Sequence, residues 1–151
     1  MDSDWLRVFD GYEYDWAMRG EPATEAQIDT IARCADYSLP RDYVAFMNQQ
    51  NGGSLWYREI WFIHLWRAQD VCSWSRNYGF TPDSMVDALA FGSDGQDSAL
   101  VFDMRSAPLD ANYPIVAVNF MAIGWDEAHL IAPHFRSLLL LQRELLAPND
   151  E

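Results

Sequence analysis

The sequence predicts a single domain built from both helices and β-strands, and three observations support this. A short helix-forming segment that begins near Pro40 runs into an Asn-Gly-Gly turn, residues 51–53, ahead of strand-like sequence. Two further strand-like segments flank an Asp-Gly pair, which favours a tight connection between antiparallel strands. A last segment, from about residue 131, repeats apolar residues at the spacing of a helix. The chain has 151 residues, the length of one domain with a substantial core.

Two helices are expected to open the domain and to form a hairpin. Thr24 followed three residues later by Gln27 is typical of a capping box, and apolar residues recur at helical spacing after it. This helix should end by about Tyr37, because the residue before a proline disfavours the helical conformation. In the second helix Pro40 suits the first turn, and Asp42 lies near the positive end of the helix dipole.

The second helix has an apolar face and a clear end signal. Its face is formed by Tyr43, Val44, Phe46 and Met47. Gly52 and Gly53 are expected to stop the helix, because glycine accepts the left-handed conformation that follows a helix. Leu39 is a poor N-cap, so packing must determine where this helix begins.

Strands are expected next. Segments 55–57 and 60–65 are strand-like, and the second is mostly apolar on both sides, which predicts a strand covered on both faces. Helical spacing returns over 67–78, with Gly79 as its end.

The second half of the chain predicts more strands and a final helix. Strands are expected at 88–91 and 99–103, joined by a turn, and at 114–120, whereas 121–130 is ambiguous. The final helix is expected from about Ile131, with Pro133 in its first turn. Its broad leucine-rich face is either fully buried or shared with another subunit, which leaves a monomer and a weak homodimer both open.

Several of these residues resemble the signature of the SUKH superfamily. The resemblance extends from about Thr24 to Leu146 and departs at His134 and over residues 1–23. It also includes the 114–116 strand and the 131–135 segment. The matching motif residues are Leu39, Pro40, Tyr43, Asn51, Gly52, Gly53, Phe91, Gly92, Asp94, Gly95 and Phe135. That superfamily includes regulators of yeast cell-wall synthesis and many bacterial immunity proteins.

The resemblance implies an α+β fold: a central, mainly antiparallel sheet against which an N-terminal helical hairpin and a C-terminal helix pack. It divides the chain into an aromatic and acidic extension (1–23), a SUKH-like domain (24–147) and a short acidic tail (148–151). The extension is expected to pack on the domain, with partner binding as the alternative. For bacterial members the resemblance implies toxin binding, and it implies no catalytic residues.

The charge limits the classes of ligand. The net charge of −13 argues against direct nucleic-acid binding, which relies on Lys and Arg. It fits a basic protein partner, although solubility alone also explains an acidic chain. Cys34 and Cys72 lie on separate expected helices, so a disulfide is left open. The acidic start lacks the pattern of a signal peptide, and no apolar run is long enough to span a membrane, so a cytoplasmic location is expected.

Catalytic and cofactor motifs are not apparent. The glycines around Asp94 join two expected strands, which is unlike a phosphate-binding loop, and the three histidines lack a metal-ligand spacing. Asp94, Asp97 and Asp103 are the candidates for acidic hydrolysis, but turn chemistry explains the first two sufficiently. We therefore expect no enzyme activity, no metal and no cofactor.

Recognition of a protein remains as the favoured role. The candidate partner-binding residues combine acids with aromatic area, although at least half of these aromatics are expected in the core. They are Trp56, Tyr57, Glu59, Trp61, Asp70, Asp94 and Asp97. The leading hypothesis is an immunity protein that neutralises a basic toxin domain, of nuclease or deaminase type. The alternatives are a regulatory or scaffold module with a non-toxin partner and, in third place, an acidic-residue hydrolase.

Overall fold

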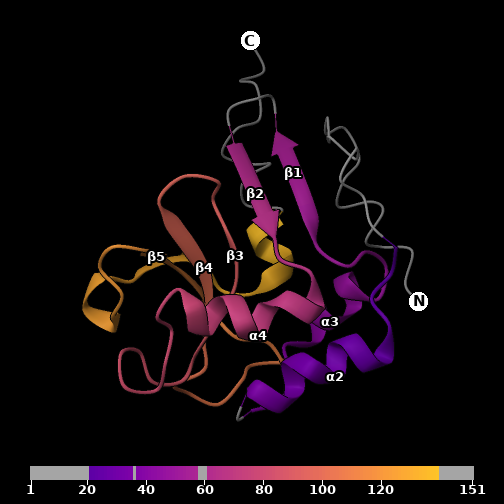
Figure 1. The fold of residues 1–151 in the computed structure, drawn as a ribbon, viewed down its shortest axis with the longest axis horizontal. Coiled ribbons are helices and arrows are strands. Elements are labelled where there is room, and N and C mark those ends of the chain that lie inside the picture. Colours follow the sequence, from indigo (N-terminus) through magenta and orange to yellow (C-terminus); the bar gives the residue numbers. More distant parts are fainter. Residues whose placement is uncertain (1–20, 36, 58–60, 140–151) are drawn as a thin grey trace.

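A six-stranded antiparallel sheet forms the centre of the computed structural model, which describes residues 21–35, 37–57 and 61–139. The strands follow one another in space in sequence order, so the sheet is a meander from one edge to the other. They are β1 (Gly53–Tyr57), β2 (Trp61–Leu65), β3 (Ala88–Ser93), β4 (Ser98–Asp103), β5 (Ile115–Asn119) and β6 (His129–Ala132). The α+β fold class expected from the sequence is confirmed (Figure 1).

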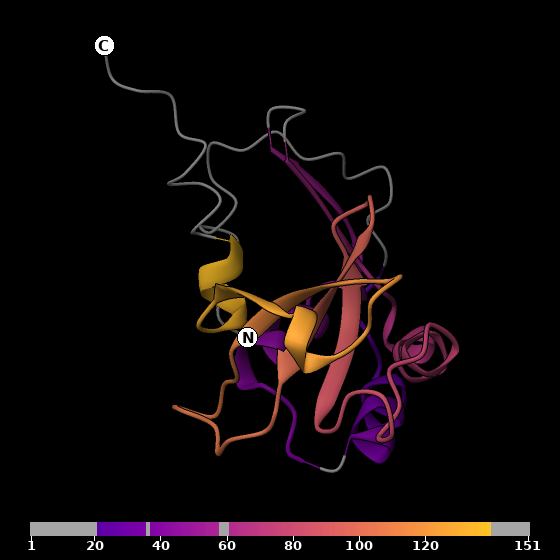
Figure 2. The ribbon, with the colours of Figure 1, turned by 90° about the vertical axis from the view of Figure 1, so that its left-hand side faces the viewer.

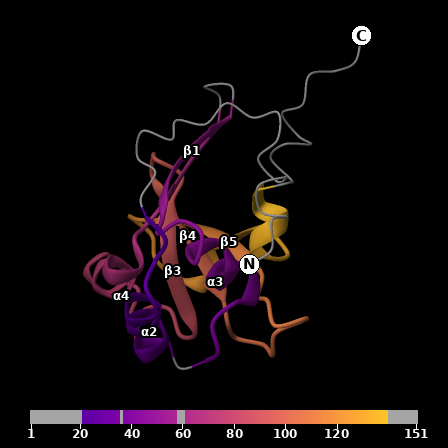
Figure 3. The same ribbon diagram turned by 90° about the vertical axis from the view of Figure 1, so that its right-hand side faces the viewer.

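Helices cover both faces of this sheet. They are α2 (Glu25–Cys34), α3 (Arg41–Met47), α4 (Ala68–Asn77), the short 3₁₀ helix η2 (Trp125–Glu127) and helical residues 135–139. Helices α2 and α4 lie on one side of the sheet, whereas α3 and residues 135–139 lie on the other (Figure 2, Figure 3). Because both faces are covered, four consecutive residues are buried in each of β3 and β4.

Helix α2 has the predicted capping box, in which the Thr24 and Gln27 side chains each bond to the other's backbone N–H. Helices α2 and α3 follow one another as expected, but α2 packs along α4 instead of α3. A Cys34–Cys72 disulfide joins α2 to α4, which answers the question that the sequence left open.

Helix α3 is held at its start by distant backbone and side-chain groups. Pro40 is its N-cap and provides no side-chain hydrogen bond. The Arg41 N–H donates to the Ala111 carbonyl at 2.8 Å, and the Asp42 N–H donates to Asn112 Oδ1 at 3.0 Å. Hydrogen bonds to residues 111–112 therefore hold the start of α3, and Pro40 precedes its first turn, one position earlier than the sequence predicted.

The Asn-Gly-Gly segment works differently from its predicted role as a helix end. Helix α3 already ends at Met47, so neither glycine occupies the position directly after it. Gly52 has a φ of +76°, and a Cβ there would lie 2.6 Å from the Leu65 carbonyl oxygen. Asn51 Oδ1 accepts a 2.6 Å hydrogen bond from the Ala68 N–H at the start of α4. Gly52 thus allows the segment to lie close against the end of β2, and Asn51 caps the start of α4.

Aromatic rings connect α3, the sheet and the last helical segment. The Tyr43 ring lies 5.4 Å from Phe91, 5.2 Å from Phe102 and 5.4 Å from Phe135, in edge-on geometry. The Phe91 and Phe102 rings stack at 4.1 Å on neighbouring strands, and Phe46 contacts Phe135 from α3. Such pairs add to the area-based stabilisation of a core. The motif residues Tyr43, Phe91 and Phe135 therefore belong to this core.

Two predictions need correction: the coverage of strand β2 and the start of the final helix. Strand β2 is buried at Ile63 and Leu65 but only half-buried at Phe62 and His64, so one of its faces remains partly open. The final helix does not start at Ile131, because residues 129–132 pair with β5 as strand β6. It starts at Phe135, where His134 and Ser137 cap it reciprocally through side chain and backbone.

Candidate functional site

The turn between β3 and β4 presents two of the predicted acids. Gly95 adopts a φ of +78°, as the Asp-Gly pair predicts. Asp94 Oδ1 accepts hydrogen bonds from the backbone N–H groups of Gln96 at 2.9 Å and Ser98 at 3.1 Å. Asp97 is exposed, and its carboxylate accepts only the Ser98 hydroxyl among the described residues. Asp94 therefore shapes the turn, and Asp97 is the acid presented to solvent.

This turn contacts two other parts of the sheet. Gly95 lies so close to the Phe62 ring of β2 that a Cβ would overlap it. On the other side, the Phe120 N–H donates to the Asp97 carbonyl oxygen at 2.9 Å. The turn acids are thereby held between an aromatic residue of β2 and the end of β5.

An aromatic row continues from Phe120 across the end of α4. The Phe120 and Tyr78 rings lie 4.6 Å apart, and the Tyr78 and Trp66 rings stack at 5.6 Å. Trp66 in turn meets Trp74 at 5.5 Å. Tyr78 is 49% exposed and Met121, next to Phe120, is 92% exposed. The row thus leads from a buried tryptophan to open apolar surface.

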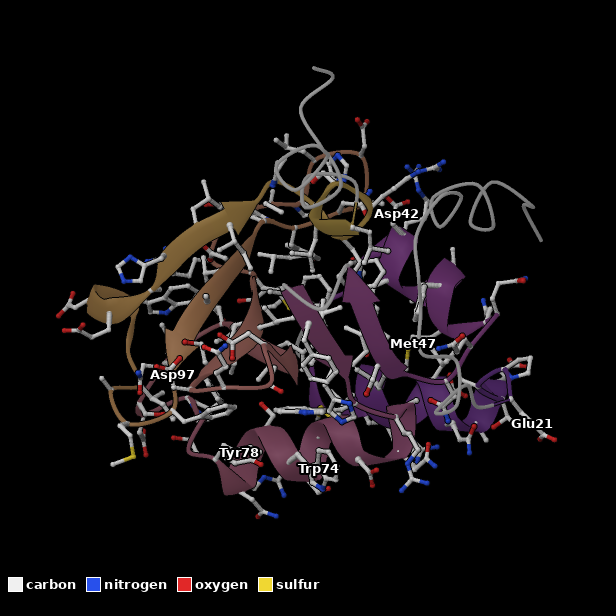
Figure 4. All side chains as sticks on the ribbon, turned by 90° about the horizontal axis from the view of Figure 1, so that it is seen from above. Glu21, Asp42, Met47, Trp74, Tyr78 and Asp97 are labelled. Atoms are coloured by element: carbon white, nitrogen blue, oxygen red, sulfur yellow. A yellow bond between two sulfur atoms is a disulfide. The ribbon has the colours of Figure 1, made fainter. Side chains whose placement is uncertain are left out.

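We define the acidic–aromatic face as the exposed or half-exposed residues that these contacts bring together. They are Phe62, Tyr78, Asp94, Asp97, Phe120 and Met121. Figure 4 shows Asp97, Tyr78 and Trp74 along the same side of the molecule. Among the described residues, no basic side chain forms an ion pair with Asp94 or Asp97. The face therefore offers apolar area beside uncompensated negative charge.

The loop that carries Phe120 and Met121 is anchored at its far end. Trp125 Nε1 donates to the Val86 carbonyl at 2.8 Å, and the Arg105 guanidinium lies 3.7 Å from the Trp125 ring centroid. Arg105 also holds the Asp103 carboxylate through two 3.0 Å hydrogen bonds. These contacts anchor the loop at Trp125, and Met121 within it is exposed.

Asp103 does not have the character of a catalytic acid. Its partial burial acts to raise the pKa of this carboxyl, but the hydrogen bonds and charge of Arg105 outweigh burial and hold the pKa below its usual value. A general acid for glycoside hydrolysis needs a raised pKa. Asp103 therefore serves as the ion-pair partner of Arg105.

The remaining predicted residues lie apart from this face or outside the described structure. Asp70 is in the first turn of α4, where its carboxylate pairs with Arg67 at 3.0 Å. Trp56, Tyr57 and Trp61 belong to the β1–β2 strand pair, in which Tyr57 lies opposite Trp61. Their side chains and the whole of Glu59 are outside the described part of the chain. The structure thus brings together Asp94 and Asp97 but not Asp70.

His64 is a structural histidine within this region. Its Nδ1 lies 3.0 Å from the Ser54 hydroxyl across the β1–β2 pair, and its ring stacks on Phe62. Burial lowers the pKa of the imidazole. Within the described residues, no three metal-ligating side chains are grouped.

Sequence reasoning missed the apolar members of the face. Tyr78 looked like the last residue of a helix, and Phe120 and Met121 fell at the border of an ambiguous segment. Their only sequence signal was position: each stands at the end of an expected element, where side chains often remain exposed.

Comparison with known families gives one match. The model of the SMI1 / KNR4 family (SUKH-1) matches residues 22–140, which is most of the chain. A comparison with curated proteins finds no match. In the part of the chain that the structure describes, no helix is both long and apolar enough to span a bilayer. The extent of the family match, together with the confirmed α+β fold, shows that this chain belongs to the SMI1 / KNR4 family (SUKH-1).

Proposed function

We propose that this protein is a cytoplasmic immunity protein that binds and neutralises a basic toxin domain of the nuclease or deaminase type. Family membership supports a binding role, because bacterial relatives in the superfamily include immunity proteins. The observation that carries the proposal further is the acidic–aromatic face, where Asp97 has no ion-pair partner among the described residues and exposed Tyr78 and Met121 supply apolar surface. A nuclease or deaminase active site that binds nucleic acid is itself basic, so its charge complements this face.

The two components of the face have different effects on binding. The negative charge of the chain, −13 overall, accelerates the approach of a basic partner. The apolar residues Tyr78, Phe120 and Met121 then supply contact area that is desolvated in the complex, and such aromatic anchors dominate binding energy. A partner seated on this face has its own basic surface covered. Inhibition then follows from occlusion, and no catalytic group is required.

The partner is first identified by affinity capture from the native lysate, at low and at high salt. A basic protein released by salt, whose toxicity is suppressed when this chain is co-expressed, is the expected result. An acidic or housekeeping partner without toxicity contradicts the immunity role and favours the regulatory or scaffold alternative.

Variants then test the face with the identified toxin. Asp97→Lys should slow association roughly threefold to tenfold at low salt and reduce its salt dependence. Tyr78→Ala should mainly raise the dissociation rate, by about tenfold for a central anchor. Asp29→Lys is the matched control, because this exposed acid lies on α2 and carries the same charge change. Equal effects of Asp97→Lys and Asp29→Lys would reject a specific role of the face.

A further inference from the structure

A cavity of about 320 Å³ lies beside the Cys34–Cys72 disulfide, and its lining includes no residue of the acidic–aromatic face. Its inner wall is apolar and includes buried Phe80, Met85 and Leu89. Both cysteines line it, Cys34 being exposed and Cys72 half-buried. A small thiol can therefore reach this disulfide from the cavity, so the bridge is more accessible to thiol–disulfide exchange than one sealed within a core.

Among the described residues that line the cavity, one is basic and one is acidic. Arg76 lines it from α4, one helical turn after Cys72 and on the same face of the helix. Asp87 lines it from the loop before β3, and its carboxylate accepts the Tyr37 hydroxyl at 2.9 Å. A guanidinium and a carboxylate at one cavity suit a ligand that carries both a carboxylate and an ammonium group.

We propose that Cys34–Cys72 is a thiol–disulfide exchange site for a low-molecular-weight zwitterionic thiol that docks in this cavity. The thiolate attacks Sγ of Cys34, the more exposed of the two cysteine residues; a new S–S bond forms, the Cys34–Cys72 bond breaks, and Cys72 leaves as a thiolate. Arg76 stabilises that thiolate. A second thiol then attacks the mixed disulfide and releases the oxidised small molecule together with the Cys34 thiol. Two thiols are oxidised, and the protein disulfide is reduced by two electrons.

The location of the bridge gives the exchange a structural consequence. Cys34 is the last residue of α2, and Cys72 belongs to α4, so the bridge ties the end of one surface helix to another. Weaker polar links also join α2 to α4: the Thr30 hydroxyl donates to the Ala68 carbonyl at 3.3 Å, and Asn51 Nδ2 donates to both Gln27 of α2 and Gln69 of α4. Reduction therefore loosens α2 on α4 and leaves the sheet unchanged.

The test uses the folded, oxidised full-length chain and two probes at equal thiolate concentration, reduced glutathione and uncharged 2-mercaptoethanol. Samples are quenched over time, alkylated and mapped by mass spectrometry. We expect glutathione to open the bridge at least about fivefold faster than 2-mercaptoethanol, with the mixed disulfide on Cys34. Hydrogen exchange of α2 should then rise, while that of β3–β5 stays constant.

Charge variants separate the cavity from general exposure. Arg76→Gln and Asp87→Asn should each reduce the preference for glutathione, whereas Arg41→Gln, on the opposite side of the sheet, should leave it unchanged. A bridge that opens only after denaturation would overturn the proposal. So would equal rates with both thiols, or a mixed disulfide found equally on Cys34 and Cys72, because either result removes the role of the cavity.

Discussion

Tyr43→Phe removes one oxygen atom from the centre of the aromatic core. The Tyr43 side chain is completely buried, and its hydroxyl has no hydrogen-bond partner in the described structure. The ring contacts to Phe91, Phe102 and Phe135 do not involve this oxygen, so a phenylalanine keeps all three. The substitution therefore isolates the energetic effect of a single buried hydroxyl.

The expected effect is stabilisation. A buried polar group without a partner costs about 1–3 kcal/mol, and phenylalanine avoids that cost without leaving a large cavity. We expect the free energy of unfolding to rise by about 1–2 kcal/mol and the melting temperature by roughly 2–8 °C. Tyr43→Ala, in contrast, loses the ring and should destabilise the fold by about 3–5 kcal/mol.

The pH dependence gives a second readout of the same hydroxyl. Burial raises the pKa of Tyr43 well above that of an exposed tyrosine. Above about pH 10 the unfolded chain loses this proton while the folded chain keeps it, so stability falls as pH rises. Tyr43→Phe removes this contribution, and its stability advantage over the wild type should grow above pH 10.

Urea unfolding followed by circular dichroism, with the disulfide kept oxidised, measures both effects. Tyr37→Phe is the control, because the Tyr37 hydroxyl is exposed and donates to Asp87. It should be neutral or slightly destabilising. A loss of stability in Tyr43→Phe would contradict this expectation, because it would mean that the Tyr43 hydroxyl makes a favourable hydrogen bond.

Three further changes test other parts of the fold. Gly92→Ala should destabilise by at least about 2 kcal/mol in urea unfolding, since its Cβ would overlap the His64 carbonyl oxygen, whereas Gly124→Ala, with open space around it, should be nearly neutral. Asn51→Ala should cost about 2–3 kcal/mol, because it removes the cap on the Ala68 N–H and leaves a buried donor without a partner; an unchanged midpoint would contradict this. The pKa of His64, measured by NMR, should lie below 6.5. The free energy of unfolding should then fall as pH drops below 6.5, because the unfolded chain binds a proton there before the folded chain does, and His64→Gln should lessen this fall.

Local signals were sufficient for much of the secondary structure. The capping box at Thr24, the Asp-Gly turn around Gly95 and the helix end at Gly79 each depend on residues within four positions of one another. Such short-range chemistry acts in any tertiary context, so it is readable from sequence. The family resemblance, now confirmed over residues 22–140, supplied the fold class.

Other features depend on contacts that local patterns do not encode. Strand β6 was mistaken for the start of a helix, because a four-residue edge strand has too little sequence to show its period. The start of α3 is held by the Asn112 side chain, which accepts a hydrogen bond from the Asp42 N–H, 70 residues away in the sequence. Neither feature has a signal within the segment itself.

The fold class, the net negative charge and the turn that presents Asp97 are all readable from the amino-acid sequence. The position of Asp97 beside Phe120 and Tyr78, and the meeting of the two cysteines at a cavity, emerge from the packing of separate elements. The two groups of features differ in the range of the interactions that produce them. Periodicity and turn chemistry act between near neighbours in the chain, whereas a binding face gathers side chains from several elements, and its composition follows from how those elements pack.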